Sequence, residues 1–203
     1  VDELNALIQK KEEELTESKS AQMNRSNVKL CEDFLHGRCG KGVTCTDSHT
    51  LQSLVAHLEQ WIEEQMRVNS RETLTITDEF GPAAWEALVD IARKVDFTAL
   101  VLRTVDRDAL LIISKAISEG QFEAVTFLDL SKNGICEVFP RGTLKLAKAL
   151  SLSDTITELS IGYNALGVSG SLALCQAVAA KGMITSLNLS GNGIVSNDPG
   201  FLH

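Results

Sequence analysis

An internal repeat runs through most of the chain from about residue 72 and constrains its fold more than any other feature. Residues 125–135, 156–166 and 184–194 share the spacing apolar-x-x-Leu-x-apolar-x-x-Asn-x-apolar. Residues 97–102 keep the first half of this pattern, with Val105 in place of the asparagine, and residues 74–76 keep only its start. The equivalent leucines, at positions 74, 100, 128, 159 and 187, lie 26, 28, 31 and 28 residues apart. Units of this length bury their apolar faces by stacking on their neighbours.

Each interval leaves room for a helix between two strands. Pro82 suits a first helical position, and the apolar residues after it recur at helical spacing: Trp85, Leu88, Val89, Ala92 and Val95. Residues 144–150 and 167–178 have similar stripes. The extra residues of the longest interval fall within 136–141, where we expect a loop insertion before the helix. Cys175 falls on the apolar stripe of the last helix, so we expect it to be buried and inert.

These segments resemble leucine-rich repeats, and the glycines and apolar spacing of residues 167–178 resemble the ribonuclease-inhibitor class of that family. The resemblance implies an α/β solenoid shaped as a horseshoe of strands and helices. Each unit would place a short strand on the inner face and a helix on the outer, with each asparagine bonded to backbone in the turn. After the last template strand, 187–189, no covering helix or polar cap is evident, so we expect further repeats or a partner there.

The positions that flank the strand leucines are expected on the concave face of the solenoid. This face is mixed and mildly acidic, which suits a protein or peptide ligand better than a nucleic acid. The alternative is a face that is only solvated. The candidate partner-binding residues are Phe127, Asp129, Glu158, Ser160 and Asn188.

A second strong signal precedes the repeats. Cys31, Cys39, Cys45 and His49 are spaced C-x7-C-x5-C-x3-H. Three thiolates and one imidazole complete the tetrahedral coordination of Zn²⁺ and leave no position for a catalytic water. A segment this short cannot fold by apolar burial alone, and metal binding must therefore supply the folding energy. The sequence therefore predicts one structural zinc ion.

Residues 31–49 resemble a CCCH zinc finger in all three ligand spacings, in Phe34 and in the Gly37-Arg38 pair. The resemblance implies binding of single-stranded or structured RNA, with bases stacked on aromatic side chains. The family's stacking positions are occupied here by Lys41 and Asp47, so Phe34 is either the only stacking residue or the core of the finger. The candidate RNA contacts are Arg25, Lys29, Phe34, Arg38 and Lys41.

Two further segments complete the predicted organisation. Residues 1–27 carry a narrow apolar stripe and should form a helix and a linker, followed by the finger at 28–50. Residues 51–71 should form an amphipathic helix that either attaches the finger to the next domain or binds a partner's groove. The leucine-rich-repeat domain then covers residues 72–203.

Composition limits the function. A net charge of −8 argues against a dedicated nucleic-acid coat, and no apolar run approaches the roughly 18 residues of a membrane span. Cys136 and Cys175 are an unpromising disulfide pair, which favours an intracellular compartment, either nucleus or cytoplasm. No catalytic constellation or phosphate-binding loop is evident, so we expect neither enzymatic activity nor a small-molecule substrate.

These observations predict a non-enzymatic adaptor in which the finger contacts RNA and the repeats bind protein partners. The alternative is a scaffold subunit of a large protein or ribonucleoprotein assembly, in which the finger only mediates protein docking. The matched ligand spacing and the nearby basic residues favour the adaptor. The missing stacking aromatics and the acidic overall charge favour the scaffold.

Overall fold

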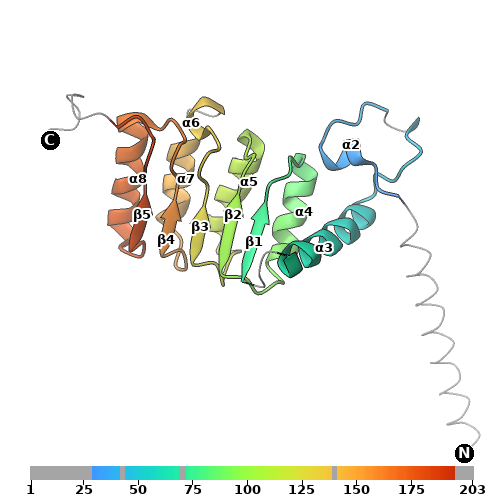
Figure 1. The fold of residues 1–203 in the computed structure, drawn as a ribbon, viewed down its shortest axis with the longest axis horizontal. Coiled ribbons are helices and arrows are strands. Elements are labelled where there is room, and N and C mark those ends of the chain that lie inside the picture. Colours follow the sequence, from blue (N-terminus) through green and yellow to red (C-terminus); the bar gives the residue numbers. More distant parts are fainter. Residues whose placement is uncertain (1–28, 42–43, 69–71, 139–140, 195–203) are drawn as a thin grey trace, which may run out of the picture.

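The computed structural model describes residues 29–41, 44–68, 72–138 and 141–194. The described chain is a mixed α/β fold with a five-stranded parallel sheet, in which the strands follow one another in chain order (Figure 1). The strands are β1 (Thr73–Ile76), β2 (Ala99–Leu102), β3 (Phe127–Asp129), β4 (Glu158–Ser160) and β5 (Ser186–Asn188). The predicted α/β class is confirmed. The helix expected within residues 1–27 lies outside the described residues, as does Arg25.

The five leucines that define the sequence pattern lie at one level of the sheet. Each is the direct partner of the next across neighbouring strands, from Leu74 through Leu100, Leu128 and Leu159 to Leu187. The first four are buried, whereas Leu187 on the last described strand is only partly buried. The register repeats because each unit returns the chain to the same level of the sheet after its helical segment.

The principal helices of the repeating region lie on one face of the sheet and leave its other face without a described covering element (Figure 1). They are α4 (Pro82–Ala92), α5 (Arg107–Ser118), α7 (Gly142–Leu150) and α8 (Gly167–Lys181). Local signals set their ends: Pro82 is at the start of α4, and the Asp106 carboxylate accepts from Ala109 N–H at 2.8 Å to cap α5. The core therefore lies between the sheet and this single helix layer.

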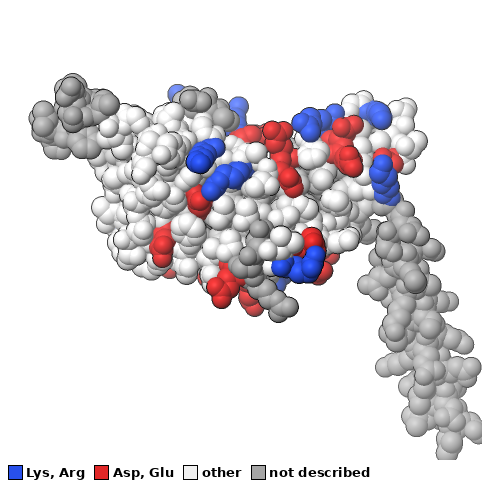
Figure 2. Space-filling view, in the orientation of Figure 1, with Lys and Arg blue, Asp and Glu red and all other residues white. Residues whose placement is uncertain are grey.

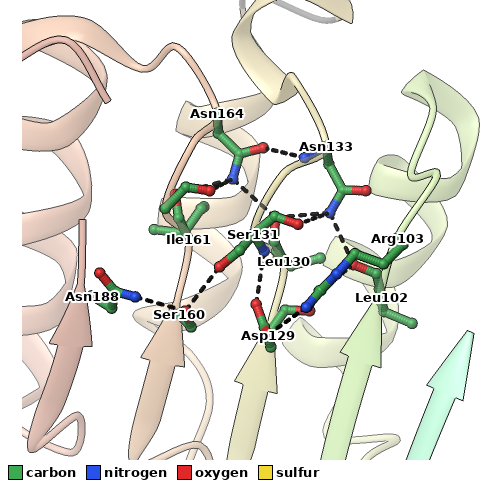
Figure 3. A network of polar contacts seen from close by, with 11 residues as sticks. Leu102, Arg103, Asp129, Leu130, Ser131, Asn133, Ser160, Ile161, Asn164 and Asn188 are labelled. Atoms are coloured by element: carbon green, nitrogen blue, oxygen red, sulfur yellow. Dashed lines mark hydrogen bonds and ion pairs between the residues drawn. The ribbon is translucent and has the colours of Figure 1, made fainter. Parts of the chain in front are cut away.

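Buried asparagines join the turns that follow the strands (Figure 3). Asn164 Nδ2 donates to Leu130 O at 2.9 Å and Ile161 O at 3.0 Å, while its Oδ1 accepts from Asn133 N at 3.0 Å. Asn192 Oδ1 in turn accepts from Asn164 N at 2.9 Å. Each asparagine side chain thus satisfies backbone groups of its own turn and of a neighbouring turn, which fixes the spacing of the units.

Two sequence expectations need correction. The insertion at 136–141 is not simply a loop, because a short helix, α6 (Ile135–Val138), forms before α7. Cys175 is exposed rather than buried. It lies on α8, the last helix of the row, so no described helix covers the side of α8 that faces away from α7 (Figure 1).

The helix α3 (Leu51–Val68) lies within residues 51–71, where an amphipathic helix was expected. Its apolar stripe is buried and consists of Leu54, Leu58, Ile62 and Met66. It packs on α4 and β1, so it covers the first edge of the sheet and connects the sheet to the segment that carries the cysteines. This stripe is therefore part of the core and is not a free groove-binding surface.

Candidate metal centre

The four predicted ligands all lie in the short segment that precedes α3. Cys31 precedes the helix α2 (Glu32–Leu35), Cys39 and Cys45 lie in the following loops, and His49 precedes α3. Two backbone hydrogen bonds close the segment: Cys31 N–H donates to Ser48 O at 3.1 Å, and Ser48 N–H donates to Lys29 O at 2.9 Å. This pairing brings the first and last ligands together although they are far apart along the finger.

The geometry of the four ligands fits a metal ion. One ligand atom from each of Cys31, Cys39, Cys45 and His49 lies within 4.8 Å of every other. The Nε2 atom of His49 is buried and has no hydrogen-bond partner. A buried nitrogen without a partner is costly, and coordination of a metal beside the three sulfurs would satisfy it. The cluster can therefore hold one metal ion.

The thiols of this cluster influence one another's ionisation. The backbone N–H of Lys41 donates to the Cys39 sulfur and lowers the pKa of that thiol. The backbone N–H of Asp47 acts in the same direction on Cys45, but partial burial and the neighbouring Cys31 and Cys39 groups outweigh it and raise the Cys45 pKa. Sulfurs this close repel one another as thiolates, and a bound dication would offset that repulsion.

Phe34 lies against a metal ligand. Its ring is stacked on the His49 imidazole with centroids 4.7 Å apart and planes within 9° of parallel. The next residue, Leu35, is buried in the same core as Leu30 and α3. One face of Phe34 is thus occupied by His49, and this contact orients the imidazole.

The basic residues proposed to contact RNA are placed beside carboxylates. Lys29 Nζ lies 3.9 Å from Asp47, and Arg38 lies 3.4 Å from Glu79. Lys41 is exposed, and no ion pair to its side chain occurs in the described part of the chain. Figure 2 shows basic and acidic side chains interspersed at this end of the molecule rather than one basic patch.

The finger packs directly on the loop between β1 and α4. Gly81 N–H donates to Leu35 O at 2.9 Å, and His36 Nδ1 is hydrogen-bonded to Glu79 O. The His36 ring is parallel to Phe80, and Phe80 makes edge-on contacts with Trp61 of α3 and Trp85 of α4. The finger, α3 and the first strand unit therefore share one packed contact.

Two glycines allow this close approach. A Cβ atom on Gly81 would lie 2.5 Å from Gly37 N and 2.6 Å from Gly37 Cα, both rigid backbone atoms. Gly37 itself has a φ of +69°, which disfavours other residues. Gly37 was recognised in the sequence only as part of the Gly37-Arg38 pair, and nothing in the sequence signalled its close approach to Gly81.

We expect Gly81→Ala to separate the finger from the sheet, because the new methyl group cannot fit against the Gly37 backbone. The cost should be about 1–3 kcal/mol, as for other overpacked contacts. Amide hydrogen exchange should accelerate at Gly81 and at residues 35–38. Gly40→Ala is the matched control, since a Cβ there meets no atom within 4 Å. Equal exchange in the two variants would contradict this contact.

The predicted partner-binding residues share the open face of the sheet. Phe127 and Glu158 are direct neighbours in one row, and Asp129, Ser160 and Asn188 are neighbours in the next. Asp129 is committed to an ion pair with Arg103 at 2.8 Å (Figure 3). Ser160 Oγ lies 2.8 Å from Ser131 Oγ and accepts from Asn188 Nδ2 at 3.1 Å. The pairing of Asp129 with Arg103 was not foreseen from the sequence.

The Arg103–Asp129 pair should make stability depend on pH. Burial acts to raise the Asp129 pKa, but hydrogen bonds from Arg103 and Ser131 lower it below its ordinary value. A depressed pKa in the folded state contributes stability above the unfolded pKa of about 3.9, and this contribution disappears as pH falls through the lower folded pKa. The difference in unfolding free energy between wild type and Asp129→Asn should therefore be constant at neutral pH and shrink below about pH 4. A difference that stays constant in acid would refute this role.

Comparison with known proteins adds no family to this description. A scan against protein-family models finds no match for the chain, and a search of curated proteins finds no significantly similar sequence. None of the helices in the described residues has the length and apolar character needed to cross a membrane. The functional argument therefore depends on the site geometry.

Proposed function

We propose that the chain is a non-enzymatic protein-interaction scaffold. In this proposal, the sheet and its helices are a leucine-rich-repeat solenoid that binds a protein partner on its open face. The CCCH finger binds one structural zinc ion and, with α3, stabilises the first edge of the solenoid. No membrane or small-molecule ligand is part of this function.

The repeating geometry supports the solenoid. The template leucines pair in register, and the asparagines of successive units bond to one another's turns. A threonine before each of the strands β3, β4 and β5 adds a second repeated contact, because the Thr126, Thr157 and Thr185 hydroxyls each donate to a carbonyl of the preceding unit. Repeated contacts between nearest neighbours are the physical signature of a solenoid.

The observation that carries the scaffold role is the packing of the finger on the domain. Leu30 and Leu35 of the finger belong to the same buried core as α3 and the sheet. Phe34 contacts His49, and Arg38 contacts Glu79 of the β1–α4 loop. Two of the side chains predicted to contact RNA, those of Phe34 and Arg38, thus already make contacts within the protein.

RNA contact by the finger is the second candidate function. Lys41 favours it, because this exposed cation lies next to the metal cluster and carries no ion pair among the described residues. Binding through one to three cations would be weak and strongly salt-dependent, with a log-affinity slope of roughly −0.7 per phosphate contact on a single strand.

Site-specific photo-crosslinking separates the two candidates. A photoreactive residue is placed at one of three exposed positions in the full zinc-loaded chain: Ser186 on the open sheet face, Lys41 in the finger, and Glu86 on α4. In an extract of the cells that make the protein, we expect protein adducts from position 186 and none from the control position 86. RNA adducts from position 41 alone would favour the second candidate. Absence of adducts from position 186 would overturn the scaffold proposal.

A further inference from the structure

We propose that the open sheet face binds a polypeptide segment that presents an apolar side chain next to a lysine or arginine. This inference rests on the proposed scaffold function and specifies the chemistry of its partner. Two adjacent features of the face carry it: a small apolar patch, formed by Ala99, Val101 and Phe127, and an unpaired carboxylate beside it.

The apolar patch lies on the face opposite the core. Ala99 and Val101 alternate with the buried Leu100 and Leu102 on β2, and both remain partly exposed. Phe127 is the direct partner of Ala99 on β3 and is also partly exposed. A phenylalanine in this position can bury much more area when a partner's apolar side chain covers it.

Glu158 supplies the charge next to this patch. It is the direct partner of Phe127 on β4, and it is exposed. Among the described residues no cation lies within ion-pair distance of its carboxylate. Neighbouring strands are about 4.8 Å apart, so a ligand that covers Phe127 would bring its adjacent side chain to Glu158.

The other carboxylate on this face cannot have the same role. Asp129 Oδ2 accepts from Arg103 at 2.8 Å, and Asp129 Oδ1 accepts from Ser131 N–H at 2.8 Å. Its negative charge is therefore compensated within the protein. Among the described residues of the strands on this face, only Glu158 has a carboxylate left to select a partner by charge, and it attracts a cation.

The remaining surroundings favour a polypeptide over a nucleic acid. Ser160 and Asn188 are uncharged and hydrogen-bond to each other. Figure 2 shows the sheet face as largely uncharged, with a few basic and acidic side chains on it. The free carboxylate would repel phosphate groups, and the whole chain carries a net charge of −8. A basic and apolar segment complements both the patch and the charge.

The test is selection of peptides from a displayed random library on the full zinc-loaded chain. We expect the selected peptides to carry an apolar residue next to lysine or arginine. Glu158→Lys should weaken a selected peptide about tenfold or more, and it should select peptides with aspartate or glutamate when the library is screened again. Phe127→Ser should weaken the peptide as well. Glu86→Lys on α4 is the control for total charge and should leave binding unchanged.

Two outcomes would overturn the inference: selected peptides without basic residues, or peptide affinities that Glu158→Lys and Glu86→Lys change equally. The crosslinking at position 186 distinguishes this failure from failure of the scaffold function. If position 186 gives protein adducts but Glu158→Lys does not change peptide binding, only the proposed partner chemistry is refuted. Absence of protein adducts at position 186 would refute the scaffold itself.

Discussion

Cys39→Ser is expected to abolish stoichiometric zinc binding and to unfold the finger while the sheet stays folded. The wild-type chain should bind one zinc ion through the four ligands that converge within 4.8 Å. Structural zinc contributes about 10–16 kcal/mol of apparent binding free energy in finger peptides, far more than the few apolar contacts of this segment can replace. Native mass spectrometry should therefore detect one zinc per wild-type chain and none in the variant.

The same variant should expose surface that now belongs to the shared core. Leu30 and Leu35 are buried against α3, so loss of the metal should accelerate amide exchange within residues 29–50 and at Gly81. Cys136→Ser and Cys175→Ser are the matched controls, because both remove a thiol outside the cluster. Retention of zinc by Cys39→Ser, or its loss from either control, would contradict the assigned ligand set. A zinc-free finger with unchanged exchange would show that the metal does not stabilise it.

The sequence predicted those features of the structure whose defining residues lie close together along the chain. The spacing of the leucines located all five strands, with the asparagine present in three of the units, and the cysteine spacing located the ligands that converge in space. Both patterns can be recognised because the residues that define them follow one another at short, fixed spacings. The α6 helix was missed because four residues without periodicity carry no such signal.

The features that sequence reasoning missed depend on contacts between distant segments. The position of the finger depends on Gly37 and Gly81, which meet only after α3 has folded back on the sheet. The exposure of Cys175 depends on which helices flank α8, and its local apolar pattern cannot reveal that. The Arg103–Asp129 pair joins two strands whose register had first to be known.

The asparagines that link successive turns should be the least replaceable polar residues of the sheet domain. Asn164 is fully buried and contacts three successive turns. Its Oδ1 accepts from the N–H groups of Asn133 and Ile135, and its Nδ2 donates to the carbonyls of Leu130 and Ile161. In the turn after β2, Val105 takes the place of the asparagine, and Asn133 of the next turn accepts the hydrogen bond from the Val105 N–H.

Asn164→Ala should lower the free energy of unfolding by about 3–5 kcal/mol. The substitution leaves several buried backbone groups without partners, and each such group costs about 1–3 kcal/mol. Because Trp85 is buried in the core, urea unfolding followed by tryptophan fluorescence can measure this loss. Asn188→Ala is the matched control: Asn188 is exposed, so water can replace its bonds to Ser160 and Ser190, and the change should stay below about 1 kcal/mol. Similar losses in the two variants would show that the buried asparagine does not hold the successive turns together.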